Sequence, residues 1–297
     1  MNTKAWISAV RLRTLPLALA SIGMGSFLAA SQYSFRLDVL IWASLTTIFL
    51  QVLSNFANDY GDTQNGADNE LRQGPTRAVQ SGVISMGTMK IAIGIFGILS
   101  FLSGLMLLHI SVGLGSAVFY MFLAFGLASI GAAYFYTAGK KPYGYAGLGD
   151  ISVLIFFGFL AVLGTYYLHT LEFAWLNLLP ALSMGLFATA VLNVNNIRDI
   201  ESDKVAGKKS IPVRIGRKKA VIYHLLMLSI GLGSSLLFVY LLPFEYSRLL
   251  ILLAAIPLGI NAKAVIQKTD SKQLDPYLKQ MAITSLIFMI LFGFSIL

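Results

Sequence analysis

Two segments of this chain combine carboxylate and amide side chains, NFANDYGDTQNGADNE (55–70) and NVNNIRDIESDKVAGKKS (193–210). Side chains three, four or seven positions apart lie on the same face of a helix. The first segment has this spacing at Asn55, Asn58, Asp59 and Asp62. The second has steps of four at Asn195, Asp199 and Asp203. If both segments are helical, each presents one stripe of oxygen-bearing side chains.

Stripes of this kind could bind a metal ion together with a phosphorylated ligand. Two carboxylate stripes that face each other repel strongly unless a positive charge lies between them. Oxygen ligands suit Mg²⁺, which proteins usually hold with one or two carboxylates, several waters and the phosphates of a substrate. Basic side chains near the two segments suit the phosphates themselves, and they are Arg11, Arg72, Arg77, Lys140, Arg198 and Lys209. The pattern predicts a site for Mg²⁺ and a diphosphate.

Long apolar runs must position these stripes. Hydrophobic residues make up 57% of the chain and charged residues 12%, with a mean hydropathy of +0.75, whereas a soluble domain carries about 25% charged residues. Runs of about 20 apolar residues suit membrane helices, and we expect them over 15–30, 39–57, 91–108, 113–137, 151–168, 174–194, 221–241, 248–266 and 280–297. The predicted fold is an all-α polytopic membrane helix bundle, about nine transmembrane helices around a central cavity open to the cytoplasmic face, in a single domain, 1–297.

The basic residues predict how such a bundle is oriented. With a cytoplasmic N-terminus, 20 of the 22 lysines and arginines fall on the cytoplasmic side, and Arg36 and Arg248 fall outside. Basic loops favour the cytoplasmic side and its anionic lipid headgroups, so we expect a multi-pass protein of the inner (cytoplasmic) membrane. The net charge of +9 is then a topology signal and predicts no nucleic-acid binding. Both acidic segments fall on the cytoplasmic side.

Some polar residues have a simpler interpretation. Acidic residues just beyond a membrane helix often lie in solvated loops, and we expect this of Glu70, Glu201, Asp270 and Asp275. The three histidines, His109, His169 and His224, are too isolated for a metal site. Aromatic residues in AAYFYTAGKKPYGYAGLGD (132–150) suit either an interfacial belt or a binding site, with Tyr136 as a candidate for substrate binding. Two amide–aspartate stripes on one side of the membrane are harder to explain as solvated loops, so they favour the site.

The two acidic segments also resemble a known family. NDYGD (58–62) resembles the motif NDxxDxxxD of the intramembrane aromatic prenyltransferase (UbiA-type) superfamily, and RDIESD (198–203) resembles its DxxxD motif. The resemblance extends over essentially the whole chain and implies an all-helical bundle whose aspartates hold Mg²⁺ and the diphosphate of a prenyl donor. It implies metal or diphosphate roles for Asn58, Asp59, Asp62, Asp199 and Asp203. Gly66 replaces the last aspartate of the first motif, and Asp68, two positions later, is a further candidate ligand.

Four longer strings resemble the branch of that family that prenylates 1,4-dihydroxy-2-naphthoate in menaquinone synthesis. They are RLRTLPLALA (11–20), NDYGDTQNGADNELRQGPTR (58–77), YTAGKKPYGYAGLGD (136–150) and NNIRDIESDKVAGKKSIPVRIG (195–216). The branch implies transfer of a polyprenyl group from an allylic diphosphate to the naphthoate, with loss of CO2 and diphosphate, giving demethylmenaquinone. The implied partners are polyprenyl diphosphate, 1,4-dihydroxy-2-naphthoate and membrane lipid.

This chemistry needs a dry cavity, because water would capture an allylic cation before an aromatic carbon does. Phe156, Phe157, Tyr134 and Tyr136 could form its walls. Two alternatives remain at this point. Another aromatic acceptor, such as 4-hydroxybenzoate, homogentisate or a tetrapyrrole, would change only the acceptor pocket. A secondary transporter or channel would favour ionisable groups near the membrane midplane, where this chain has almost none.

Overall fold

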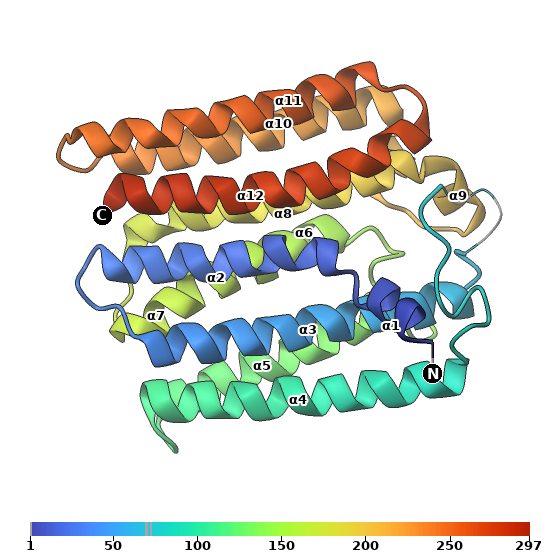
Figure 1. The fold of residues 1–297 in the computed structure, drawn as a ribbon, viewed down its shortest axis with the longest axis horizontal. Helices are drawn as coiled ribbons and strands as arrows, with labels where there is room; N and C mark the ends of the chain where they lie inside the picture. The colour runs from blue at the N-terminus through green and yellow to red at the C-terminus, as the bar shows by residue number, and fades with distance from the viewer. Residues whose placement is uncertain (1, 69–70, 72) are drawn as a thin grey trace.

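The computed structural model describes residues 2–68, 71 and 73–297, and every regular element in this part is helical (Figure 1). The elements of the first half are α1 (Thr3–Val10), η1 (Leu12–Thr14), α2 (Leu15–Ala30), α3 (Leu37–Gln64), α4 (Met86–Val112), α5 (Ala117–Phe135), α6 (Gly149–Val153), η2 (Leu154–Leu163) and α7 (Gly164–Thr170). Those of the second half are η3 (Trp175–Asn177), α8 (Leu178–Arg198), α9 (Ile200–Val205), α10 (Ile211–Tyr240), η4 (Tyr246–Ala254), α11 (Ala255–Gln267), η5 (Ser271–Leu274) and α12 (Asp275–Ile296).

Within the described residues, nine helical stretches are long and apolar enough to cross a membrane, which confirms the all-α bundle predicted from composition. A spanning segment must satisfy its backbone hydrogen bonds internally, so these apolar runs become helices and not sheets. Several stretches are longer than expected. The second extends over Leu37–Gln64, where apolarity alone predicted 39–57. The first acidic stripe therefore lies within a continuous helix.

Large side chains in the middle of the bundle join its two halves. Met24 of α2, Phe187 of α8 and Phe292 of α12 are completely buried and belong to one hydrophobic cluster. The rings of Phe187 and Phe288 meet edge to face, with their centroids 4.8 Å apart. Packing of this kind holds α2, from the N-terminal half, against α8 and α12 of the C-terminal half. It thereby sets the distance between the two polar segments.

The helix spanning 149–170 departs from α geometry in its middle. Its central ten residues, η2, form a π-helix between α6 and α7. Gly158 of η2 lies against Gly185 of α8, and a Cβ atom added at Gly158 would lie 2.8 Å from the Cα atom of Gly185. Small residues allow membrane helices to approach closely. This contact brings η2 and α8 together in the middle of their spans.

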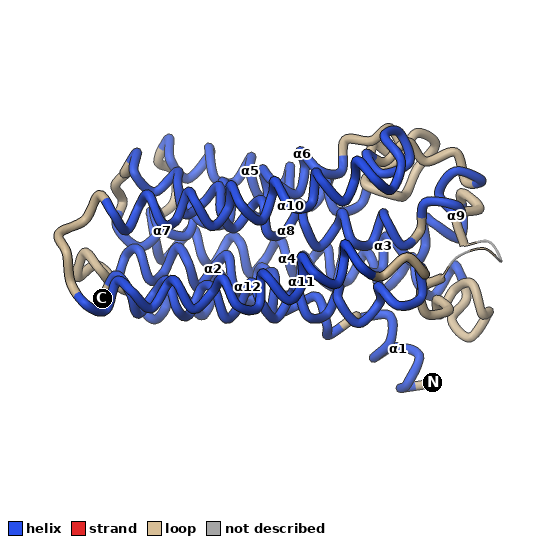
Figure 2. The backbone as a smooth tube through the Cα atoms, turned by 90° about the horizontal axis from the view of Figure 1, so that it is seen from above, coloured by secondary structure: helices blue, strands red, loops and turns tan. Residues whose placement is uncertain are grey.

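The two ends of the bundle differ in their contents. The N-terminus, α9 and the connection between α3 and α4 lie at one end, and the C-terminus lies at the other (Figures 1 and 2). We call the first of these the polar end, because the last turns of α3 and α8 and the whole of α9 lie there. Since α3 runs the length of the bundle, Arg36 before its first residue lies at the opposite end.

Candidate active site

A polar cavity of about 220 Å³ opens at the polar end, and both predicted stripes reach it. The first stripe contributes Asn55, Asn58 and Asp62, and the second contributes Asn195, Asp199 and Asp203. Basic residues also line it, namely Arg11, Arg13, Arg77, Arg198, Lys208 and Lys279. The structure thus brings together two segments that are more than 130 positions apart in the chain. It also surrounds their oxygens with cations.

A close backbone approach positions the end of α3. A Cβ atom added at Gly61 would lie 2.5 Å from the carbonyl carbon of Thr137, so only glycine allows α3 to lie this close to the segment after α5. Thr137 in turn donates its hydroxyl to the Asn58 Oδ1 atom at 2.9 Å. Asn65 donates its side-chain amide to the Thr137 carbonyl at 2.9 Å. The segment after α5 is therefore anchored to the acidic face of α3.

Asp62 lies at the centre of this arrangement. Its side chain is 3% exposed and forms ion pairs with Arg77 and with Lys208, whose Nζ atom lies 3.1 Å from the Asp62 Oδ1 atom. Tyr145 donates its hydroxyl to the same oxygen at 2.6 Å. Burial raises the pKa of Tyr145 and the negative charge of Asp62 raises it further, so the phenol keeps its proton and remains a donor. A buried carboxylate requires such partners.

Arg77 connects two acidic side chains and one backbone carbonyl of the first segment. Besides Asp62, it pairs with Asp68 through its Nε atom at 3.2 Å, and it donates to the carbonyl of Asn58 at 2.6 Å. Burial alone would lower the pKa of Arg77, but the carboxylates of Asp62 and Asp68 outweigh it and raise the pKa. The guanidinium therefore stays charged beneath the cavity.

The second stripe departs from the prediction of one continuous helix. Asp199 has φ −103° and ψ 16°, so α8 ends before it and α9 begins after it. Arg198 holds this junction through two bonds to the Asp199 carboxylate, at 2.9 Å from Nε and 2.6 Å from Nη2. Asn195, Asp199 and Asp203 nevertheless all line the polar cavity. The chain bends there, and the stripe stays on one side of the bend.

Asp203 shares Lys208 with Asp62, because the Lys208 Nζ atom also lies 3.5 Å from the Asp203 Oδ1 atom. Burial raises the pKa of Asp203 to about 6, and the neighbouring charges of Asp199 and Asp62 also raise it while Lys208 opposes the shift. The ammonium group thus occupies the position between the two stripes where a positive charge was expected.

The remaining predicted site residues lie in several places. Asp59 and Asp68 are buried but are not among the residues that line the polar cavity. The Asp59 carboxylate accepts a hydrogen bond from the Val79 amide at 3.4 Å, and Arg77 connects Asp68 to Asp62. Tyr136 and Arg198 line the cavity. Arg72, a predicted phosphate contact, and Glu70 lie outside the described residues.

Lys140 and Lys209 differ from the prediction, since both are exposed and neither lines the polar cavity. Lys208 takes the place expected of its neighbour, because the backbone amide of Lys209 bonds to the Tyr145 carbonyl at 2.9 Å. Two adjacent lysines give no local signal of which one points inward.

Asp275, expected in a solvated loop, is only partly exposed and pairs with two arginines. Its distances are 3.2 Å to Arg13 and 2.5 Å to Arg198. Arg13 is 262 positions away in the chain, so nothing in the local sequence around Asp275 indicates the contact. Tyr145 and Asp150 also line the polar cavity. Tyr145 belongs to the aromatic segment 132–150 that suited either a belt or a binding site, whereas Asp150 was not a predicted site residue.

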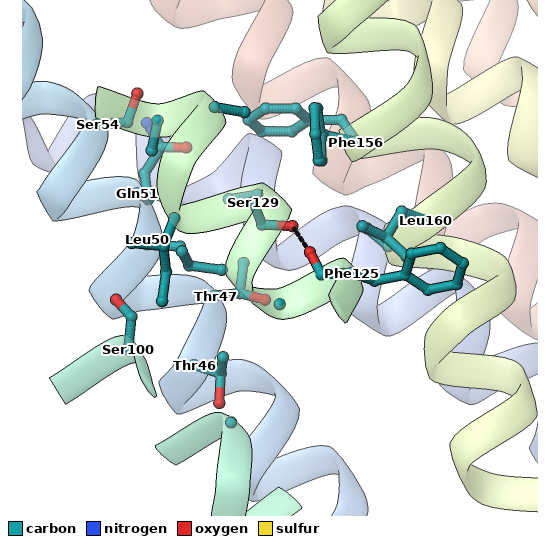
Figure 3. A pocket seen from close by; sticks show the side chains of 18 of the residues that line it. Thr46, Thr47, Leu50, Gln51, Ser54, Ser100, Phe125, Ser129, Phe156 and Leu160 are labelled. Carbon is teal, nitrogen blue, oxygen red and sulfur yellow. Dashed lines mark hydrogen bonds between the residues drawn. The ribbon is translucent and has the colours of Figure 1, made fainter. Parts of the chain in front are cut away.

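A second cavity, of about 370 Å³, is largely apolar and continues from the polar one toward the middle of the bundle. Figure 3 shows side chains of α3, among them Leu50, Gln51 and Ser54, on one side of it, with Phe156 and Leu160 of η2 among the others that line it. Phe157 and Tyr136 also line it, as expected of aromatic walls, whereas Tyr134 packs in a separate cluster. Both cavities share Gln51, Asn58, Tyr136, Val153, Phe157 and Leu192.

The donors of the polar cavity fit a hard cation that is accompanied by phosphate. Among the described residues, no group of three or more acidic, histidine or cysteine side chains lies close enough to hold a metal ion. Mg²⁺ needs few protein ligands when phosphate and water supply the rest. The Lys208 ammonium, between Asp62 and Asp203, demonstrates that a positive charge is accommodated there.

Comparison with known proteins agrees with this geometry. A model of the UbiA prenyltransferase family matches residues 18–287. A 1,4-dihydroxy-2-naphthoate octaprenyltransferase of Haemophilus influenzae is 46% identical over 296 residues, which cover 99% of this chain and 96% of that protein. The protein of the same name from Escherichia coli is 44% identical over 297 residues, with coverage of 99% and 96%.

Solved structures share the fold. A UbiA homolog from Archaeoglobus fulgidus bound to DMAPP and Mg²⁺ superposes with a TM-score of 0.69 at 16% identity, covering 98% of each chain. The same homolog bound to GPP and Mg²⁺ gives 0.69 at 17% identity, covering 98% of this chain and 99% of that one. The chain therefore belongs to the UbiA prenyltransferase family, and the nine apolar helices of its described residues make it a multi-pass membrane protein.

Proposed function

We propose that the protein transfers a polyprenyl group from an allylic diphosphate to 1,4-dihydroxy-2-naphthoate, with release of CO2 and diphosphate, giving the quinol form of demethylmenaquinone. The observation that carries the proposal is the meeting of two cavities of opposite character, one polar and cationic, the other apolar. An amphipathic donor with a charged head and a hydrocarbon tail matches both. The names of the H. influenzae and E. coli relatives favour the naphthoate as acceptor over 4-hydroxybenzoate or homogentisate.

In this proposal the polar cavity binds the diphosphate. One or two of the carboxylates of Asp62, Asp199 and Asp203 would hold each Mg²⁺ together with the diphosphate and water, with Asn58 and Asn195 as neighbouring oxygen donors, and the ion when bound neutralises charge on the leaving diphosphate. Lys208 and Arg77 are the protein's own cations beside Asp62, at the place where the diphosphate oxygens would bind. Preorganised positive charge of this kind favours departure of the leaving group. Asp59 and Asp68 act through Arg77, which they help to keep charged and oriented.

The apolar cavity then receives the prenyl tail. Its walls exclude water from the allylic carbon, so the cation formed on departure of the diphosphate survives until the acceptor attacks. Phe157 and Tyr136 line the junction of the cavities, where their ring faces can stabilise positive charge. The electron-rich acceptor ring would bind at the same junction, and loss of its carboxylate as CO2 restores aromaticity.

We further propose that residues 1–297 form a single domain with the polar end on the cytoplasmic side of the inner membrane. The concentration of basic residues supports this orientation. A cytoplasmic opening suits a water-soluble aromatic acid and the release of diphosphate into the cytoplasm, while the polyprenyl tail stays within the bilayer.

The test of the proposed reaction uses purified protein, an allylic diphosphate, and naphthoate labelled at its carboxyl carbon. We expect labelled CO2 and prenylated product in equal amounts, both requiring Mg²⁺. Prenylation of 4-hydroxybenzoate without reaction of the naphthoate would reject the acceptor and keep the reaction class. Absence of prenyl transfer to any aromatic acid would reject the class.

A further inference from the structure

Asp150 is a buried carboxylate that the proposed function does not yet use. It is 6% exposed and lines the polar cavity. Tyr223 of α10 donates its hydroxyl to the Asp150 Oδ1 atom at 3.3 Å, which is long for such a bond. Within the described part of the chain Asp150 forms no ion pair, whereas Asp62, Asp68, Asp199 and Asp203 all pair with arginine or lysine. A carboxylate has room for about four hydrogen bonds, so Asp150 retains capacity for a ligand.

Its place on the helix directs it toward the reacting carbon. Asp150, Val153 and Phe157 follow at three- and four-residue steps, and all three line the polar cavity. Val153 and Phe157 also line the apolar cavity, so this face of the helix lies along the junction where the allylic carbon must sit. Tyr136 also lines the junction. Burial raises the pKa of Tyr136, and the negative charge of Asp150 raises it further. Asp150 therefore lies on the helix face that borders the junction, and among the described residues it pairs with none of the cations that line the polar cavity.

The reaction at this junction needs a group that accepts a proton. When the ring carbon bearing the carboxylate attacks the allylic carbon, the electron pair comes from the ring, and the adjacent hydroxyl becomes a carbonyl. The proton of that hydroxyl must leave as the carbon–carbon bond forms. A positioned side chain that accepts this proton speeds the step, and a cavity with apolar walls leaves little water to take its place.

We propose that Asp150 is the catalytic base that takes this proton and later returns it. This proposal rests on the proposed function and adds the residue that deprotonates the acceptor. The allylic carbon–oxygen bond breaks and its electron pair leaves with the diphosphate. The new carbon–carbon bond forms, and the hydroxyl proton moves to Asp150, which leaves a carboxylate on the carbon next to a carbonyl. That carboxylate leaves as CO2, its bonding pair restores the ring, and the oxygen recovers the proton from Asp150. Charge and protons balance over the cycle.

The experiment separates ionisation of the donor from transfer to the acceptor. For Asp150→Asn, we expect transfer to fall at least about 100-fold, the size of a general-base contribution. Release of diphosphate should stay within about threefold of wild type, because Asp150 pairs with none of the cations beside Asp62, and prenyl alcohol should accumulate because a cation that the acceptor does not consume persists until water reaches it. Asp270→Asn, at an exposed position, is the matched control and should behave as wild type. Ring-halogenated acceptors have more acidic hydroxyls, which lose their proton more easily. With them the transfer rate of Asp150→Asn should fall less far below that of wild type.

Three results would overturn the proposal. They are wild-type transfer by Asp150→Asn, equal losses of ionisation and transfer, and a defect that does not change with acceptor acidity.

If the asparagine variant does not fold, the equal-sized pair Asp150→Glu and Asp150→Gln replaces it. Prenyl transfer should be at least about tenfold faster with Asp150→Glu than with Asp150→Gln. Equal rates for these two variants would reject Asp150 as the base. The ratio of variant to wild-type transfer rates is measured with any hydroxylated aromatic acid that the wild type prenylates. If the wild type fails to prenylate the naphthoate alone, this rejects only the acceptor assignment. Failure with every acceptor rejects both.

Discussion

The Nζ atom of Lys208 lies 3.1 Å from the Oδ1 atom of Asp62, so a cation from the segment after α9 meets the acidic face of α3. The same ammonium reaches Asp203 at 3.5 Å and lies over the ring of Tyr145, 4.8 Å from its centroid. Without such a charge, the two buried carboxylates would repel each other in a medium of low dielectric constant. Lys208 therefore keeps the two stripes together and offers its charge to an incoming diphosphate.

Replacing Lys208 with methionine should weaken binding of inorganic diphosphate in the presence of Mg²⁺ by at least about tenfold, since one charge-assisted contact is lost. Lys209→Met is the matched control, and it should bind within about twofold of wild type because Lys209 is exposed. Isothermal titration calorimetry of the detergent-solubilised protein measures both. Equal losses for the two variants would contradict the placement of Lys208.

Replacing Asp62 with asparagine should abolish most of the Mg²⁺-dependent release of diphosphate, by about 100-fold or more, because the amide no longer supplies charge to the metal site. Asp199→Asn should lose activity in the same assay, and Asp270→Asn should not.

Replacing Asp62 with asparagine should also lower the stability of the fold. Asp62 is buried against Arg77, and breaking a buried ion pair costs about 3–5 kcal/mol. The remaining Asp68–Arg77 contact should offset some of this loss. Thermal unfolding in detergent measures it, and an unchanged Tm for Asp62→Asn would contradict the buried pair.

The raised pKa of Asp203, about 6, predicts a pH-dependent stability in the absence of Mg²⁺. An unfolded aspartate releases its proton near pH 3.9, whereas the folded protein holds it up to about pH 6. Stability from this group is thus complete below pH 4 and is lost as the pH rises through 6. The loss is about 3 kcal/mol.

The measurement for Asp203 is chemical unfolding in detergent and EDTA at pH 4.5, 5.5 and 7, pH values that bracket the transition. Wild type should lose stability relative to Asp203→Asn across this range, because the amide cannot titrate. Parallel curves for the two proteins would show that Asp203 titrates normally.

Replacing Gly61 with alanine should separate α3 from the segment that follows α5, because the new methyl group would lie 2.5 Å from the Thr137 carbonyl carbon. We expect a loss of about 1–3 kcal/mol in unfolding free energy, the usual cost of overpacking. Gly97→Ala in α4 is the control, since a Cβ atom there meets nothing within 4 Å. It should be neutral or slightly stabilising. Unfolding of the two variants in parallel gives the comparison.

The orientation of the bundle is testable because the chain contains no cysteine. An impermeant thiol reagent added to intact spheroplasts should label Tyr33→Cys, at the end opposite the polar cavity. It should not label Lys204→Cys, in α9. Both positions are exposed. Labelling of Lys204→Cys from outside would place the polar end on the wrong side of the membrane.

Helix spans and polar stripes could be predicted from the sequence because both are encoded locally. A run of apolar residues specifies a spanning helix wherever it packs, since lipid leaves its backbone no other partner. The spacing of Asn55, Asn58 and Asp62 places them on one face of any helix that contains them. These features do not depend on which helices become neighbours.

Only the tertiary structure decided which charges meet. Arg13 and Asp275 lie 262 positions apart and come together because α2 and α12 pack side by side through the apolar core. Lys208, and not Lys209, reaches Asp62 because the chain turns at Gly207, which has φ +72°, and the Lys209 amide binds the Tyr145 carbonyl. The bend at Asp199 and the position of Asp59 outside the cavity also depend on contacts between separate segments. Ion pairs and turns in a buried site depend on the positions of several separate segments at once. Periodicity along one segment therefore cannot predict them.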